Sequence, residues 1–115
     1  MLSIVIASAI YAAALQNAAA TSARSALVTC LRTAVAEAQK AKVAPEALTD
    51  QMRQACAAEA GKLKSALVAF DVKNGIGRKQ AASDADLQLD DYYATQEDHY
   101  RYELEKQAPK AASAN

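Results

Sequence analysis

The chain has 115 residues, which is room for one domain. Its 13 basic and 13 acidic residues sum to a formal net charge of zero, so it lacks the basic excess of nucleic-acid-binding proteins, and we predict no nucleic-acid partner. Hydrophobic residues make up 52%, but the chain has one Phe and no Trp, and alanine supplies much of that fraction. Large apolar side chains are scarce, so a covalent cross-link would help to stabilise the fold.

An uncharged and mostly apolar segment occupies residues 2–15, and the first charged side chain is Arg24. Such a segment is too short to span a bilayer, but it matches the hydrophobic region of a secretory signal peptide. No Lys or Arg precedes it, and small residues allow cleavage after Ala14 or Ala20. We therefore predict a signal peptide over residues 1–20 and no stable membrane span after its removal. The alternative is an apolar first helix that is retained in a bundle.

A chain reversal is predicted between two helices, the first from Thr21 or Ser22 to Lys42 and the second from Pro45 to about Lys73. Proline suits the first turn of a helix and disfavours α geometry in the residue before it. Apolar residues recur at helical spacing on both sides of the reversal. These residues are Leu27, Cys30, Leu31, Ala34, Ala38 and Ala41 before it, and Leu48, Met52, Cys56, Ala60, Leu63, Leu67 and Phe70 after it.

The two cysteines lie at equal offsets from this reversal, because Val43 is 13 positions after Cys30 and 13 before Cys56. In an antiparallel hairpin the two residues come level with each other, which predicts an intramolecular disulfide. A closed loop of this length restricts the unfolded chain by about 3 to 4 kcal/mol. A disulfide indicates an oxidising compartment, so we predict a periplasmic or secreted protein. Two free thiols packed as small hydrophobic groups are the alternative.

The helical pattern stops at Asn74-Gly75-Ile76-Gly77. Asn or Gly can adopt the left-handed conformation that ends a helix, and Ile76 can then fold back onto the last turn, as in a Schellman-type cap. A phosphate-binding glycine loop would need a preceding strand and a different spacing.

A third helix begins at Arg78 or at Asp84, with the residue before it as the cap in either case. It continues to about Gln107. Beyond Pro109 the sequence is short and polar, so residues 109–115 are predicted to form a flexible tail after a helical domain over residues 21–108.

Charge is unevenly distributed along the chain. Residues 1–80 contain ten basic and five acidic residues, whereas residues 81–115 contain three basic and eight acidic ones. We expect the acidic flank of the third helix to meet basic residues of the hairpin, namely Lys62, Lys64, Arg53 or Lys73, at about 0 to 1 kcal/mol for each exposed pair. The functional alternative is an acidic docking surface for a basic partner.

The sequence lacks a recognisable catalytic motif. His99 is the single histidine, which excludes two-histidine metal sites, and no Cys-x-x-Cys is present. His99 and Glu103 form an i, i+4 pair that could hold a metal loosely, and the alternative is a histidine that faces solvent or packs on tyrosine. Four further carboxylates lack calcium-ligand spacing and are predicted to form a solvated face: Asp84, Asp86, Asp90 and Asp91. We predict no enzymatic activity and no cofactor.

Four tyrosines lie within eleven residues of the third predicted helix: Tyr92, Tyr93, Tyr100 and Tyr102. Neighbouring helical residues point about 100° apart, so these four rings cannot share one narrow seam. They either pack on the alanine-rich hairpin or form an aromatic surface for a protein partner or for self-association. Tyr93 and Tyr100 share a stripe with Leu89 and Leu104, whereas Tyr102 lies off this stripe.

Several features recur together over roughly residues 27–105. They are a cysteine in the first helix, Ala-Lys-Val before the reversal, a second cysteine, Phe70-Asp71-Val72-Lys73-Asn74-Gly75 and Asp90-Asp91-Tyr92. In this layout the chain resembles short exported all-helical proteins of bacteria that carry two cysteines. The resemblance implies export to the periplasm and helicity, and it implies no activity.

We therefore predict an all-α fold, in which a signal peptide precedes a disulfide-joined antiparallel hairpin and a third long helix packs back on it as a small three-helix bundle. The predicted function is that of a non-enzymatic cell-envelope interaction or structural protein that acts through helical surfaces. An accessory periplasmic protein that binds a metal or a small ligand is the alternative.

Overall fold

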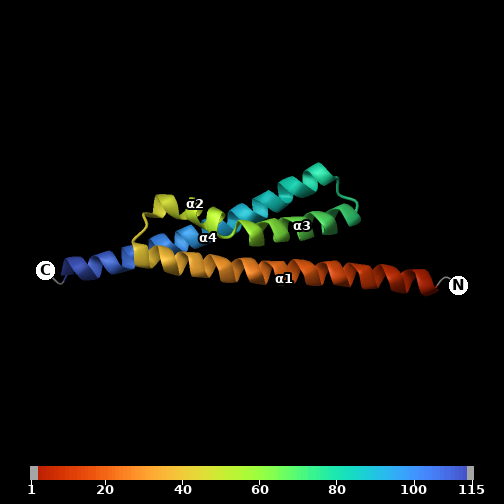
Figure 1. Ribbon diagram of the computed structural model, residues 1–115, viewed down its shortest axis with the longest axis horizontal. Coiled ribbons are helices and arrows are strands. Elements are labelled where there is room, and N and C mark those ends of the chain that lie inside the picture. Colours follow the sequence, from red (N-terminus) through yellow and green to blue (C-terminus); the bar gives the residue numbers. More distant parts are fainter. Residues whose placement is uncertain (1–2, 114–115) are drawn as a thin grey trace.

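The computed structural model describes the backbone of residues 3–113 and the side chains of residues 18–108. The described backbone forms helices and turns without a strand, which confirms the all-α class (Figure 1). The four helices are α1 (Ser3–Ala41), α2 (Pro45–Ala55), α3 (Ala57–Lys73) and α4 (Arg78–Ser113). They build an elongated molecule of 79 × 24 × 19 Å. The predicted signal peptide and tail fall mostly on residues whose side chains are not described.

The reversal between α1 and α2 lies where the sequence predicts it, with Pro45 as the first residue of α2. The α1 helix ends in a Schellman motif, because Val43 N donates to Ala38 O at 3.0 Å and Lys42 N donates to Gln39 O at 3.2 Å. Lys42 adopts the left-handed conformation at φ 54°, which is a position that favours glycine.

The turn between α3 and α4 ends α3 with the predicted Schellman motif. Ile76 N donates to Asp71 O at 3.0 Å, and Gly75 N donates to Val72 O at 3.1 Å. Gly75 has φ 92°, a conformation that glycine adopts freely and that would strain a residue with a Cβ atom. The side chain of Ile76 stays 36% exposed. Helix α4 then starts at Arg78, which is the first of the two predicted starts.

The second arm of the hairpin is interrupted at Cys56, although the sequence predicts one helix from Pro45 to Lys73. Cys56 has φ −114° and ψ 23°, outside the helical range, while its N–H still donates to Met52 O at 2.9 Å. The apolar stripe of the arm runs through the interruption without a change of period. A pattern of buried residues therefore could not reveal the break between α2 and α3.

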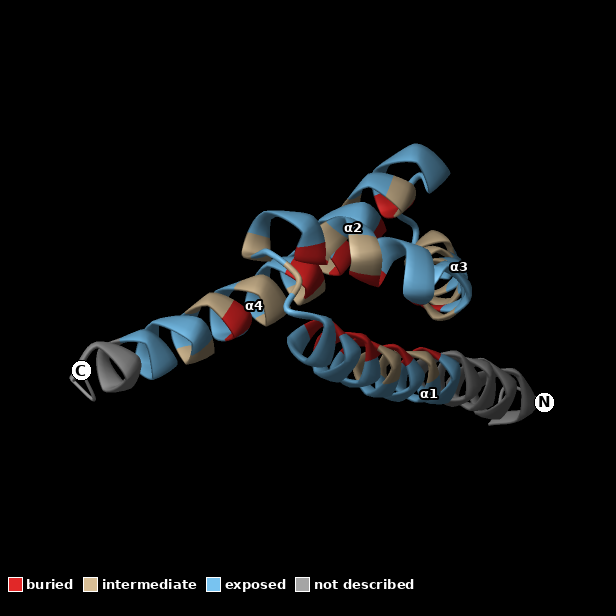
Figure 2. Ribbon diagram, turned by 60° about the vertical axis from the view of Figure 1, so that its left-hand side comes forward, coloured by how far each residue is buried: buried red, intermediate tan, exposed pale blue. Residues whose placement is uncertain are grey.

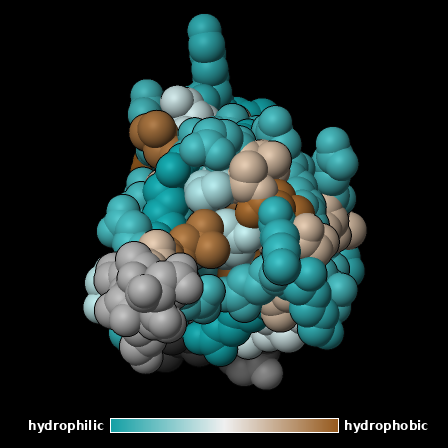
Figure 3. Space-filling view, turned by 90° about the vertical axis from the view of Figure 1, so that its left-hand side faces the viewer, coloured by the Kyte–Doolittle hydropathy of each residue, from teal (hydrophilic) through white to brown (hydrophobic). Residues whose placement is uncertain are grey.

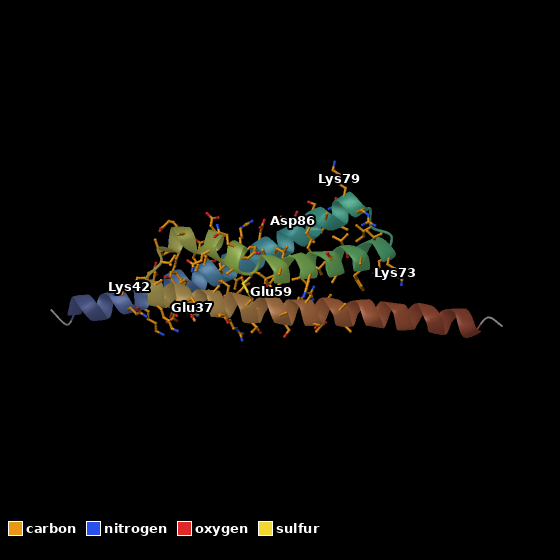
Figure 4. The ribbon with its side chains drawn as sticks, viewed as in Figure 1. Glu37, Lys42, Glu59, Lys73, Lys79 and Asp86 are labelled. Atoms are coloured by element: carbon orange, nitrogen blue, oxygen red, sulfur yellow. A yellow bond between two sulfur atoms is a disulfide. The ribbon has the colours of Figure 1, made fainter. Side chains whose placement is uncertain are left out.

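The disulfide between Cys30 and Cys56 is present, with the two Cα atoms 5.9 Å apart. It joins the middle of α1 to the residue between α2 and α3, and it is drawn beside Glu59 in Figure 4. The predicted intramolecular pairing is confirmed.

The core forms where α1 lies along α3 and where α4 packs against α2 and α3 (Figure 2). Most of the predicted apolar positions are buried, among them Leu27, Leu31, Leu48, Met52, Leu63 and Leu67. Four positions differ from the prediction, because Cys30 and Phe70 are half-buried, Ala41 is exposed and Leu104 is 38% exposed. Ala41 and Phe70 lie near the ends of α1 and α3, and Leu104 lies on the part of α4 that continues beyond the end of α1.

Candidate interaction surface

Tyr100 is a core residue that also fixes the reversal between α1 and α2. Its side chain is 1% exposed. Its hydroxyl donates to Val43 O at 2.5 Å and approaches Ala38 O at 3.5 Å. These carbonyls belong to the end of α1 and to the turn after it. The Tyr100 side chain of α4 thus donates a hydrogen bond to backbone carbonyls at the point where α1 ends, where carbonyls lack a partner within the helix.

Tyr93 is also internal, with 5% of its surface exposed. The Arg53 guanidinium lies over its ring at 4.9 Å from the centroid, and the same group pairs with Asp90 at 3.1 Å. Burial raises the pKa of Tyr93, while the charge of Arg53 opposes the shift and that of Asp90 adds to it. The ring therefore favours its neutral form in the folded protein.

The other two tyrosines remain accessible in different surroundings. Tyr92 is half-buried in a shallow pocket with Gln88 and Thr95. Tyr102 is 58% exposed beyond the last buried residue of α4, with the Lys106 amine 5.8 Å from its ring centroid. The structure therefore does not gather the four tyrosines on one surface, and Tyr93 and Tyr100 are not available to a partner.

Polar contacts attach α4 to the hairpin, as the charge distribution predicts. Arg53 pairs with Asp90 at 3.1 Å, and Lys64 pairs with Asp86 at 2.8 Å. These are two of the four predicted basic residues, and Lys62 and Lys73 have no ion-pair partner within the described residues. Every partner in these pairs is at least 40% exposed, so each pair contributes about 0 to 1 kcal/mol.

Arg101 adds a second set of contacts near the start of α2. It pairs with Glu97 at 3.0 Å and with Glu46 of α2 at 3.4 Å. The hydrogen bond to Glu97 raises the pKa of the Arg101 guanidinium. The Thr49 hydroxyl lies 3.3 Å from the Glu97 carboxylate, so α2 and α4 are linked by polar groups along one edge.

His99 is exposed and Glu103 is half-buried. Within the described residues, one group of three potential ligands converges, and it consists of Cys30, Cys56 and Glu59 rather than this pair. The two sulfur atoms of that group are bonded to each other, so neither is a thiolate that could bind a metal. The pair of His99 and Glu103 has no third His, Cys, Asp or Glu ligand close by in the part of the chain that the structure describes.

A groove of about 690 Å³ lies at the end of the molecule that carries the reversal. One wall is formed by residues 42–45 of the turn, and the other by α4 through Tyr100, Glu103, Leu104 and Gln107. We call this feature the end groove. Figure 3 looks along the long axis at this end and shows hydrophobic surface between hydrophilic side chains.

The end groove exists because α4 continues beyond the last residue of α1. Leu104 follows Tyr100 by four residues and so lies on the same face of α4, but α1 has already ended at Ala41. The sequence pattern predicts that Leu104 is in the core, because helical periodicity identifies the apolar face of α4. Periodicity does not show where the neighbouring helix, α1, ends. The proline turn before α2 is the one sequence signal that marks this limit.

Comparison with known proteins gives no relative: no protein-family model, no curated protein and no solved structure matches this chain. Among the described residues, no helix combines the length and the hydropathy that a membrane-spanning segment requires.

Proposed function

We propose that this chain is an exported, non-enzymatic binding protein of the cell envelope, and that its end groove receives the apolar face of a helix from a partner protein. The scaffold is the disulfide-joined hairpin with α4 packed back on it. The observation that carries the proposal is the accessible apolar surface of Leu104 and of the turn beside it, at a place where the core face of α4 has no neighbouring helix.

Export is supported by the Cys30–Cys56 disulfide, because such bonds persist in oxidising compartments. The uncharged segment over residues 2–15 adds the sequence argument. Ala20 is 5% exposed and belongs to the described core, so cleavage after Ala14 keeps it in the mature chain, whereas cleavage after Ala20 removes it. We therefore propose Ala14 as the cleavage site. The intact mass of the protein from a periplasmic extract distinguishes the two products.

A helical occupant fits the shape and the chemistry of the end groove. Val43, Ala44 and Pro45 form an apolar wall, and Leu104 provides the opposite one. Lys42 and Glu103 lie at its edges, so an occupant that carries both signs of charge beside its apolar face matches the groove. A helix placed there would extend the line of α1 and would cover the face of α4 that α1 leaves open.

The test compares Leu104→Ser with Leu87→Ser. Leu87 is a matched control because it is 62% exposed on a different face of α4 and lies far from the end groove. Tagged wild-type protein and both variants are used to capture proteins from envelope extracts, which are then quantified by mass spectrometry. A photo-crosslinking residue at position 104 or 87 shows where each captured protein makes contact.

We expect at least one envelope protein that wild type and Leu87→Ser capture equally, that Leu104→Ser loses, and that cross-links from position 104 and not from position 87. Thermal unfolding of both variants controls for damage to the fold. Equal loss in the two variants, or cross-linking from position 87 alone, contradicts the proposed groove.

A further inference from the structure

The end of the molecule opposite the end groove carries a concentration of unpaired positive charge. Residues 62–80 contain five basic side chains and a single acidic one, Asp71. Lys64 is neutralised by Asp86 at 2.8 Å. The three cations next to the α3–α4 turn, Lys73, Arg78 and Lys79, have no ion-pair partner among the side chains that the structure describes. All three are exposed.

An apolar residue lies between these cations in the sequence. Ile76 is 36% exposed at the tip of the turn, where the Schellman motif holds the backbone. Figure 4 shows Lys73 and Lys79 on opposite sides of this turn, with Lys79 directed away from the helices. We call Lys73, Ile76, Arg78 and Lys79 the basic tip.

A groove of about 820 Å³ leads from the basic tip along α3 and α4. Val68, Ala69 and Val72 contribute apolar surface to it, and Lys73 and Arg78 lie at the end near the tip. Cations beside exposed apolar surface match the interface of a lipid bilayer, where anionic headgroups border the acyl region.

We propose that the basic tip binds the surface of a membrane that contains anionic phospholipids. Lys73, Arg78 and Lys79 contact the headgroup phosphates, and Ile76 enters the boundary between headgroups and acyl chains. The N-terminal end of α1 lies at the same end of the molecule as the turn (Figure 1). This inference concerns a different surface from the end groove, so either proposal can fail without the other.

The test measures partition of the full chain onto vesicles of phosphatidylcholine with and without phosphatidylglycerol. Residues 2–15 carry no charge, so the ratio of the two partition coefficients reports the cations and not this apolar segment. The main variant is the triple substitution Lys73→Gln, Arg78→Gln and Lys79→Gln. A Lys or Arg near an anionic surface strengthens binding about fivefold, so three substitutions lower the ratio on the order of 100-fold.

The matched control removes the same charge elsewhere, by Arg32→Gln, Lys40→Gln and Lys42→Gln. These cations are exposed on or next to the C-terminal half of α1. We expect this control to keep the ratio of wild type, and Ile76→Ser to weaken binding to both kinds of vesicle without changing its dependence on salt. Circular dichroism checks that each variant is folded, and the double substitution Arg78→Gln and Lys79→Gln replaces the triple one if that variant unfolds.

Four results would overturn the proposal. The first is a wild-type ratio near one, and the second is an equal loss in the main and control variants, which would indicate a general effect of net charge. The third is self-association through the basic tip, detected by sedimentation in the absence of vesicles and lost in the main variant. The fourth is binding to nucleic acid in place of vesicles, which would assign the tip to another class of partner.

Discussion

Removal of one hydroxyl group, by Tyr100→Phe, isolates the contact between α4 and the reversal. The hydroxyl donates to Val43 O at 2.5 Å, and Ala38 O at 3.5 Å is a weaker second acceptor. Ala38 O also accepts from Val43 N at 3.0 Å and keeps that partner in the variant. The substitution therefore removes the donor of one carbonyl, Val43 O, and leaves the buried ring in place.

The expected cost of Tyr100→Phe is about 1 kcal/mol in the free energy of unfolding. Loss of a hydrogen bond in which the acceptor stays buried and unpaired costs about 1 to 3 kcal/mol, and the half-buried position of Val43 favours the lower value because water can reach the turn. For a domain of this size the change lowers the melting temperature by about 4 to 8 °C.

Urea unfolding followed by circular dichroism measures this effect, with Tyr102→Phe as the matched control. Tyr102 is 58% exposed, so removal of its hydroxyl should change the stability by less than about 0.5 kcal/mol. Hydrogen exchange should be faster at the Val43 amide in Tyr100→Phe than in wild type. An unchanged unfolding midpoint for Tyr100→Phe would refute the assignment of this hydroxyl to the turn.

Three further predictions test other parts of the fold. The double variant Cys30→Ala and Cys56→Ala should lose about 3 to 4 kcal/mol, because the bond closes a loop with a sequence separation of 26, and its urea midpoint should no longer respond to reductant. Lys42→Gly should raise the free energy of unfolding by about 0.5 to 1 kcal/mol, since glycine tolerates φ 54°. Lys40→Gly inside α1 should lower the free energy of unfolding by about 1 kcal/mol. Equal effects of the two substitutions would contradict the left-handed conformation of Lys42. Burial raises the pKa of Tyr93 above its ordinary value of 10.0, so the unfolded chain ionises first and stability falls as the pH rises past about 10. Tyr93→Phe should lose stability less steeply over that range, and an identical slope would show that Tyr93 does not titrate differently in the two states.

The hairpin was predictable because its causes are local. Pro45 disfavours a helical conformation in the residue before it, and the apolar stripes on both sides have the helical period. Once the reversal is placed, the position of the disulfide follows from counting residues between Cys30 and Cys56. The cap at Gly75 is local in the same sense, since few residues other than glycine adopt φ 92° without strain.

The interruption at Cys56 and the exposure of Leu104 could not be predicted, because both depend on neighbours that are distant in sequence. Helices α2 and α3 both pack on α1 and α4, and the interruption falls at the residue that the disulfide joins to α1. Leu104 is accessible because α1 ends at Ala41. The sequence left open whether the tyrosines pack in the core or form a surface, because aromatic residues are enriched in both places. Their burial follows the stripe, since Tyr93 and Tyr100 lie on it and are buried, whereas Tyr102 lies off it and is exposed.

Although the net charge of this chain is zero, the two ends of the molecule carry charges of opposite sign. The contacts of Arg53 with Asp90 and of Lys64 with Asp86 neutralise the middle of the molecule. The unpaired cations of the basic tip lie at one end, while residues 98–105 of α4, toward the other end, contain three acidic residues and one basic residue. An anionic membrane surface would attract the first end and repel the second. A protein bound by its basic tip would then direct the end groove away from the bilayer, toward a partner that approaches from the aqueous side.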